Sequence, residues 1–149
     1  MRAVFQRVKK ASVSVGGQEV ASQGKGAMVL LAVGKEDTEK DAHYMAEKIA
    51  GLRVFPDSEG KMNLSLLDIG GEVLLISQFT LYGDVKKGKR PGFDGAAAPE
   101  LGERLYLLNA EALNRLGVTT RTGVFGAYMQ VELVNDGPVT ILISSKKEF

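Results

Sequence analysis

The chain contains an uninterrupted apolar stretch, Ala27-Met28-Val29-Leu30-Leu31-Ala32-Val33. A strand with one face in solvent alternates apolar and polar side chains, so an unbroken apolar run predicts a strand that is buried on both faces. The turn sequence Gly24-Lys25-Gly26 precedes it and separates it from the residues before. We therefore expect other parts of the chain to pack on both sides of this strand.

The residues before this stretch predict a β-hairpin. Serine and valine alternate over residues 12–15, which is the two-residue period of a half-buried strand. The pair Gly16-Gly17 then supplies a tight turn. Residues 18–23 return as a second strand, and the next turn leads into the apolar stretch.

Two helices are predicted after the apolar stretch. Residues 38–50 place their apolar side chains on one helical face. Thr38 can cap this helix, with Asp41 three residues later in an imperfect capping box. The second helix opens at Pro99, because proline is favoured at the first helical position, and it ends at Gly117.

Further strands are predicted at residues 52–55, 72–81, 118–122, 128–135 and 139–144. Residues 83–98 are rich in glycine and basic residues and predict a long loop, and loops of this length are uncommon unless they are functional. The order of elements does not match a βαβ repeat. We therefore predict a single domain over residues 1–149, of mixed α/β class, with a largely antiparallel, barrel-like sheet and two packed helices.

The composition is that of an ordinary globular domain. The 149 residues are 44% apolar and 25% charged. No apolar run is long enough to cross a bilayer, and the N-terminal residues lack the apolar core of a signal peptide. Cysteine is absent, which excludes disulfides and thiolate catalysis. We therefore expect a cytoplasmic protein that does not bind membranes.

Charge gives no general argument for a polyanionic partner, because the net charge is only +1. Basic side chains gather in one place within the predicted loop, at Lys86, Lys87, Lys89 and Arg90. Their spacing alone favours a solvated loop over a binding site.

Several common catalytic designs are not predicted. The only histidine, His43, lies off the apolar stripe of the first helix and is expected at the surface. Ser-His-Asp, Cys-His and zinc sites therefore lack their residues, and no phosphate-binding or dinucleotide-binding glycine motif is present. We predict no metal and no cofactor. An enzyme with this sequence must use hydroxyls, amides, backbone groups or groups of its substrate.

The segment Ser77-Gln78-Phe79-Thr80-Leu81 ends a predicted buried strand with polar side chains. Polar groups in such a place need hydrogen-bond partners. Composition alone favours a strand end whose polar groups are satisfied locally. The alternative is a pocket floor, in which Gln78 and Thr80 face a ligand while Phe79 faces the core, or the reverse.

The segment Asn135-Asp136-Gly137-Pro138 separates the last two predicted strands and is typical of a β-turn. A peptide bond before proline can also be cis at modest cost. A cis bond between Gly137 and Pro138 would point two backbone carbonyls in nearly the same direction, and such a pair could hold a substrate ammonium group. The residues alone do not choose between these interpretations.

Four segments resemble the D-aminoacyl-tRNA deacylase family. They are QRVKKASVSV (residues 6–15), GKMNLSLLDIGGEVLLISQFTL (60–81), KRPGF (89–93) and MQVELVNDGPVTI (129–141). The similarity extends over essentially the whole chain, and the SQFTL and NDGPVT motifs are specific in combination. The resemblance implies a barrel-like homodimer that hydrolyses the ester between a D-amino acid and the terminal ribose of tRNA, and also glycyl-tRNA mischarged on alanine tRNA.

The resemblance also implies a catalytic segment, Ser77, Gln78, Phe79 and Thr80. Backbone amides near Phe79 and Thr80 are expected to stabilise the oxyanion, and the 2′-hydroxyl of the tRNA to help activate water. Thr80 as a covalent nucleophile is an alternative, although no base is evident to deprotonate it.

The remaining expected sites concern substrate recognition. Gly137 and Pro138 of one subunit would enter the pocket of the other and reject L-amino acids. Phe125 and Met129 match positions near the terminal adenosine. Because tRNA is now an expected partner, the basic residues of the loop become candidate phosphate contacts. These are Lys86, Lys87, Lys89 and Arg90.

Two positions depart from the family pattern: Gly92 stands where a serine is expected, and Tyr128 where an acidic residue is expected. Two other functions compete with the hydrolase. An RNA-binding module without catalysis would need stacking aromatics among basic residues, but aromatics are only 7% and tryptophan is absent. A structural protein would use the segment at Gly137 and Pro138 as a dimer interface.

Overall fold

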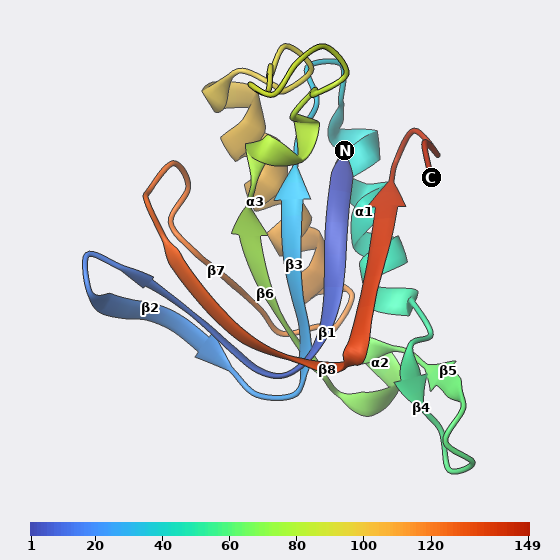
Figure 1. The fold of residues 1–149 in the computed structure, drawn as a ribbon. Helices are drawn as coiled ribbons and strands as arrows, with labels where there is room; N and C mark the ends of the chain where they lie inside the picture. The colour runs from blue at the N-terminus through green and yellow to red at the C-terminus, as the bar shows by residue number, and fades with distance from the viewer.

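The computed structural model describes residues 1–149, which form a six-stranded sheet with two long helices on one face (Figure 1). The strands of this sheet are β1 (Arg2–Val15), β2 (Gln18–Gln23), β3 (Gly26–Ala32), β6 (Glu72–Ser77), β7 (Thr120–Thr122) and β8 (Gln130–Ser144). They lie in the order β2-β1-β3-β6-β7, and β8 also pairs with β1. The covering helices are α1 (Glu39–Gly51) and α3 (Pro99–Arg115).

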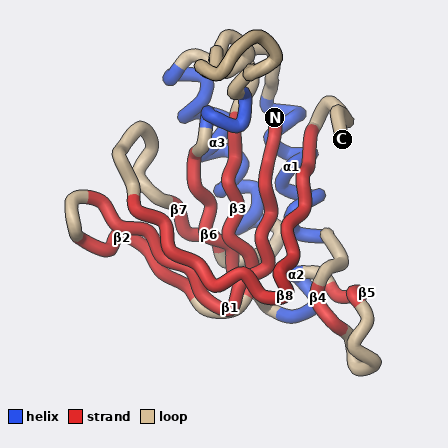
Figure 2. Tube along the Cα trace, viewed as in Figure 1, coloured by secondary structure: helices blue, strands red, loops and turns tan.

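The long strand β1 joins two parts of the sheet. Its residues 2–8 pair with β3 and its residues 11–15 pair with β2, while β8 runs antiparallel along its other edge. The register shifts on either side of Val8 and after Val13, and such bulges bend a strand. The second half of β1 therefore curls with β2 and β8 away from the helices, which gives the sheet its barrel-like shape (Figure 2).

The apolar stretch forms β3 in the middle of the sheet, and its predicted burial on both faces is confirmed. Ala27, Val29 and Leu31 belong to the main core, which includes the inner faces of both long helices. Met28 belongs to a smaller core that lies under the curled strands. The neighbouring strand β6 divides its side chains between the two cores in the same way.

The predicted fold class, mixed α/β with a largely antiparallel barrel-like sheet, is confirmed. Strand β1 is antiparallel to β2, β3 and β8. However, β3 pairs with β6 and β6 with β7 in parallel, and α1 and α3 lie in the two connections. The expectation that the helices form no βαβ unit is therefore wrong for this half of the sheet. The uninterrupted apolar character of β3 and β6 is typical of parallel strands.

Both predicted helices are present and pack against each other. Helix α1 begins after Thr38, whose backbone N–H donates to Asp41 Oδ2 at 2.9 Å, so the predicted capping box is confirmed. Pro99 is the first residue of α3, as predicted. Asn109 of α3 donates a buried hydrogen bond of 2.9 Å from Nδ2 to the carbonyl oxygen of Ala42 in α1. Neither helix, nor any other in the structure, has the length and apolar character that a membrane span requires.

Several predicted boundaries are wrong. Residues 52–55 contribute only Phe55 to a strand, because Leu52 still caps α1; the short β4 (Phe55–Pro56) pairs with β5 (Met62–Leu64). A one-turn helix, α2 (Leu66–Ile69), begins after Ser65, whose hydroxyl accepts a hydrogen bond from the Asp68 N–H. The sequence analysis missed this helix, because its apolar residues were too few to set a period.

Candidate active site

A cavity of about 600 Å³ is lined by residues at the carboxyl ends of β3 and β6 and by the end of the loop of residues 83–98. This loop lies beyond the ends of the two strands (Figure 1). The wall of the cavity is mostly apolar. The lining residues are Ala32, Val33, Ile76, Ser77, Gln78, Phe79, Phe93, Ala96, Ala97, Pro99, Gly102, Phe125, Gly126, Ala127, Tyr128, Met129 and Val131. Clefts at the carboxyl ends of parallel strands are a common place for ligand binding in α/β folds, and this cavity is the candidate active site.

The structure brings five of the residues singled out in the sequence to this cavity. They are Ser77, Gln78, Phe79, Phe125 and Met129. Thr80 follows directly in the chain but does not line the cavity, and neither do Gly137, Pro138 or the four basic residues of the loop. His43 is exposed on α1, as expected.

Strand β6 was predicted to continue to Leu81, but it is shorter. It ends at Ser77, and a 3-10 helix, η1 (Phe79–Tyr82), follows. Gln78 makes the transition, and its N–H donates to the carbonyl oxygen of Leu31 at 2.9 Å. Because the chain leaves the strand here, the alternation of Gln78, Phe79 and Thr80 that the pocket-floor alternative assumed does not occur. Gln78 and Phe79 both line the cavity, and the Phe79 side chain is 56% exposed.

The start of η1 leaves backbone donors available at the cavity. The first N–H groups of a helix have no partner within it, and the N–H groups of Phe79 and Thr80 make none of the turn and loop hydrogen bonds of the chain. The Thr80 Oγ1 accepts a hydrogen bond of 2.5 Å from Nε2 of Gln78, which orients the side chain but leaves its own O–H free to donate. The segment therefore presents two backbone N–H groups without backbone partners, next to the Ser77 hydroxyl in the cavity lining.

The wall opposite η1 is built from α3 and the residues after β7. The ring of Phe125 packs on Gly102 of α3, where a Cβ would lie 3.4 Å from its Cζ. It also lies 5.9 Å, centre to centre, from the ring of Tyr106. Burial raises the pKa of Tyr106 to about 12, so its hydroxyl stays protonated and donates to the Leu75 carbonyl at 2.6 Å. Phe125 is thereby fixed relative to β6.

Met129 reaches the cavity because Gly123 has no side chain. A Cβ on Gly123 would lie 2.7 Å from the sulfur of Met129. Phe125 and Met129 both line the cavity and contribute to its apolar wall. Tyr128 also lines the cavity and is 87% exposed.

The segment that contains Gly137 and Pro138 lies away from the cavity of its own chain. Residues 128–135 and 139–144 were predicted as two strands joined by a turn, but β8 runs through both without a turn. The bond between Gly137 and Pro138 is cis, which is the alternative that the sequence left open. Both residues are exposed.

Side chains on both sides hold this exposed segment. Arg7 Nε donates to the carbonyl oxygen of Asp136 at 2.9 Å, and its Nη1 donates to the Val54 carbonyl at 2.6 Å. Asn135 Oδ1 accepts a hydrogen bond of 3.0 Å from the Val139 N–H. The sequence analysis missed Arg7 as a support of the segment, since its partners are backbone groups that are distant in sequence.

The basic residues lie at the exposed tip of the predicted loop. Backbone hydrogen bonds of 2.8 and 3.0 Å between Asp84 and Gly92 close this tip. Phe93 then contacts Phe79 edge to face, with ring centres 5.1 Å apart. The basic side chains form no ion pair and are Lys86, Lys87, Lys89 and Arg90.

One part of the cavity wall escaped the sequence analysis altogether. Ala96 forms a β-bridge with Gly34, and the Ala97 N–H donates to the carbonyl oxygen of Val33 at 2.9 Å. These contacts turn the end of the loop into a third wall. The run of small residues from Gly95 to Ala98 was the only signal, since small side chains leave room for a ligand.

Comparison with known proteins identifies the family. The model of a family described as D-Tyr-tRNA(Tyr) deacylase matches residues 4–144. A protein named D-aminoacyl-tRNA deacylase from Symbiobacterium thermophilum is 60% identical over 149 residues, covering 100% of this chain and 99% of that protein. One of the same name from Koribacter versatilis is 58% identical over 149 residues, covering 100% of both. The protein is therefore a hydrolase. It belongs to the D-Tyr-tRNA(Tyr) deacylase family, which confirms the resemblance.

Solved structures agree with this fold. The c-Myc DNA Unwinding Element Binding Protein superposes with a TM-score of 0.92 at 45% identity, over 97% of this chain and 98% of that one. A probable eukaryotic D-amino acid tRNA deacylase gives a TM-score of 0.82 over 95% of this chain and 97% of that one. Its identity of 18% supports the fold alone.

Proposed function

We propose that the protein hydrolyses the ester between a D-amino acid and the terminal ribose of tRNA, in the cavity at the end of β6. The observation that carries this proposal is the pair of N–H groups at Phe79, which lines the apolar cavity, and at the adjacent Thr80, since neither has a backbone partner. The cavity lining contains no carboxylate, histidine or lysine that could act as the base for a nucleophile. An aminoacyl ester is an activated acyl compound, so a strong nucleophile is not required. Donors fixed at the developing oxyanion lower the barrier to attack by water.

The adenosine and the ester occupy different parts of the cavity. The apolar surface of Phe125 and Met129 takes the terminal adenosine, and the ester carbonyl then lies toward the start of η1. Holding the ester and a water molecule in near-attack geometry contributes much of the rate. The 2′-hydroxyl of the ribose, which is adjacent to the ester, helps to activate that water.

Thr80 acts in this scheme through its backbone and not as a covalent nucleophile. Its hydroxyl accepts a hydrogen bond from Gln78 and lies outside the cavity lining. A hydroxyl nucleophile also needs an adjacent base, and the only histidine is on α1.

We infer that the exposed Gly137 and Pro138 of one subunit close the cavity of a second subunit in a homodimer. They do not line their own cavity, and Val134 and Leu142 of the same strand are also exposed apolar residues. Backbone groups of this segment grip the substrate ammonium and leave one open direction at the α-carbon. A D side chain takes that direction, an L side chain collides, and glycine passes.

The basic tip of the loop contacts the phosphates of tRNA. Its four side chains have no carboxylate partner among the ion pairs of the structure, and the loop reaches the cavity through the contact between Phe93 and Phe79. A locally concentrated positive charge is what a protein of low net charge needs in order to bind nucleic acid. Because aminoacyl-tRNA is made and used in the cytoplasm, we place the protein there.

A second candidate function is nucleic-acid binding without hydrolysis. The observation in its favour is the name of the c-Myc DNA Unwinding Element Binding Protein, whose chain is 45% identical to this one. The cavity argues for the hydrolase, because binding alone does not need free donors at the end of a buried strand.

Deacylation of matched substrates separates these functions. The protein is mixed with one tRNA carrying a D-amino acid, its L-enantiomer or glycine, and the release of each amino acid is followed. We expect rapid loss of the D and glycyl esters and persistence of the L ester. Binding of all three without turnover would support the second candidate, and equal hydrolysis of D and L esters would contradict the selectivity mechanism.

A further inference from the structure

Arg2 connects the first strand to the helix that carries the proposed donors. Its Nη1 donates a hydrogen bond of 3.0 Å to the carbonyl oxygen of Leu81. Its guanidinium carbon also lies 4.4 Å from the ring centre of Tyr82, within the range of a cation–π contact. Both partners belong to η1. A side chain from the start of β1 therefore holds the far end of the helix that begins at Phe79.

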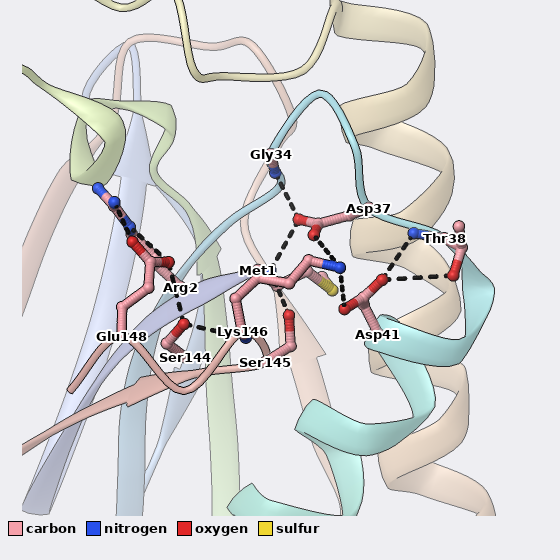
Figure 3. Close-up of polar contacts among 10 residues, drawn as sticks. All are labelled: Met1, Arg2, Gly34, Asp37, Thr38, Asp41, Ser144, Ser145, Lys146 and Glu148. Atoms are coloured by element: carbon pink, nitrogen blue, oxygen red, sulfur yellow. Dashed lines mark hydrogen bonds and ion pairs between the residues drawn. The ribbon is translucent and has the colours of Figure 1, made fainter.

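The guanidinium group is itself held from the C-terminal tail. Its Nη2 and Nε donate to Oε2 and Oε1 of Glu148 at 2.5 and 3.3 Å (Figure 3). Ser144 donates a further hydrogen bond of 3.0 Å to Glu148. The hydrogen bond from Arg2 lowers the pKa of Glu148, which keeps the carboxylate ionised. A planar two-point contact fixes the orientation of the guanidinium, which a lysine ammonium could not do.

Helix η1 has few other restraints. It has four residues, and 3-10 helices have poorer hydrogen-bond geometry than α-helices. Phe79 and Thr80 are exposed. Its other restraints are the ring contact between Phe79 and Phe93 at 5.1 Å and Tyr82, whose hydroxyl packs so closely on Gly34 that a Cβ there would lie 2.6 Å away. Loss of Arg2 would therefore let η1 tilt without opening the core of the sheet.

We propose that Arg2 is a positioning residue for hydrolysis: by holding Leu81 and Tyr82 against β1, it fixes the direction of the N–H groups of Phe79 and Thr80. Glu148 acts one step further out, since it orients Arg2. Arg2 touches neither the cavity nor the substrate. This inference rests on the proposed function, because the proposed function assigns the N–H groups of Phe79 and Thr80 to the oxyanion.

Substitutions of Arg2 test the proposal through the separation of kcat from KM. In Arg2→Gln, we expect kcat for D-aminoacyl-tRNA to fall about tenfold. A misdirected donor weakens the stabilisation of the transition state but not the binding of the substrate. KM should stay within about twofold, since the adenosine surface is unchanged. Arg2→Lys should recover part of the loss, and Glu148→Gln should give a smaller loss of the same kind.

Arg115→Gln is the matched control, because Arg115 also pairs with a glutamate, Glu111 at 2.6 Å, but on the exposed face of α3. It should leave kcat and KM unchanged. Amide hydrogen exchange provides a second readout: in Arg2→Gln it should accelerate within η1 and stay slow in β3 and β6. An unchanged kcat, or a change in KM alone, would overturn the proposal.

The remaining outcomes are also decisive. If Arg2→Gln does not fold, Arg2→Lys and Glu148→Gln apply the same test, and an unchanged kcat in both would overturn the proposal. If the wild-type protein does not hydrolyse D-aminoacyl-tRNA, the proposed function fails. Exchange within η1 then still reports whether Arg2 holds this helix.

Discussion

Two segments of the chain, residues 77–82 and residues 135–140, differ in how they use their backbone. The first ends a buried strand, lines the cavity of its own chain and presents N–H groups without partners. In the second, Gly137 and Pro138 are exposed and lie outside that cavity, and Arg7 and Asn135 bind its backbone from both sides. We propose that the first acts within its own chain and that the second presents a fixed surface to another chain. In our account the first carries hydrolysis and the second carries selectivity.

Blocking the cavity should have the largest effect. Ala96→Phe places a ring in the cavity of about 600 Å³, so the substrate can no longer reach the start of η1. We expect kcat/KM for D-aminoacyl-tRNA to fall at least about 100-fold, since even small misplacements of a substrate cost that much. Ala98→Phe is the control, because Ala98 is exposed and does not line the cavity. Full activity in Ala96→Phe would place the reaction elsewhere.

A change in the second segment should have the next largest effect. A Cβ on Gly137 would lie 2.9 Å from Val139 Cγ2 and 3.0 Å from Arg7 Nη2, and its φ of +136° disfavours other residues. Gly137→Ala should lower the free energy of unfolding by roughly 1–3 kcal/mol and kcat/KM by about 10- to 100-fold. Gly60→Ala has a φ of +79° and no neighbour within 4 Å. Gly60→Ala shares only the strain of a positive φ, so it should lower the unfolding free energy less and leave the rate unchanged. Equal rates in both variants would mean that Gly137 takes no part in the reaction.

Removing the Thr80 hydroxyl should have a modest effect. Thr80→Val keeps the backbone N–H and loses only the acceptor of the Gln78 hydrogen bond. A neutral hydrogen bond is worth about 0.5–1.5 kcal/mol, so we expect kcat to fall less than about tenfold in single-turnover assays. A loss of about 10⁴-fold, as for a missing nucleophile, with recovery in Thr80→Ser would restore Thr80 as the attacking group.

A change outside both segments should alter stability alone. Burial raises the pKa of Asp41, but hydrogen bonds from Thr38, Ser145 and Lys146 outweigh it and hold the pKa well below its usual value. Because the pKa of this carboxyl is lower in the folded state, ionisation stabilises the protein at pH values above the unfolded-state pKa of about 3.9. This stabilisation is lost as the pH falls through the folded-state pKa. Asp41→Asn should therefore lower the unfolding free energy at neutral pH by about 1–2 kcal/mol. In urea titrations this difference should shrink toward about pH 3, while kcat at neutral pH stays unchanged.

Local patterns predicted those parts of the fold that local forces determine. The apolar stretch of β3, the capping box at Thr38 and the proline that opens α3 all had signals within a few residues. The strand predicted over residues 72–81 ends four residues earlier in the structure, because apolar character does not reveal where a strand gives way to a 3-10 helix. The parallel pairing of β3 with β6 is a long-range contact, which periodicity does not report.

In the candidate site too, residues with local signals could be predicted, and residues that act through long-range contacts could not. The motif residues Ser77, Gln78 and Phe79 could be singled out because polar side chains at the end of an apolar run are unusual. Arg2, Arg7 and Ala96 could not, since each acts through backbone groups that are distant in sequence. The motif resemblance supplied the family, whereas the supports of the two segments needed the three-dimensional contacts.

Mixed dimers test the division between the two segments most directly. Ala96→Phe blocks the cavity but keeps Gly137, whereas Gly137→Ala alters the second segment but keeps the cavity. If each segment serves the cavity of the other subunit, a mixed dimer contains one fully intact site. Random exchange of equal amounts should then restore about a quarter of the wild-type rate on D-aminoacyl-tRNA, because half of the dimers are mixed. A rate no higher than the mean of the two variants measured separately would contradict the account.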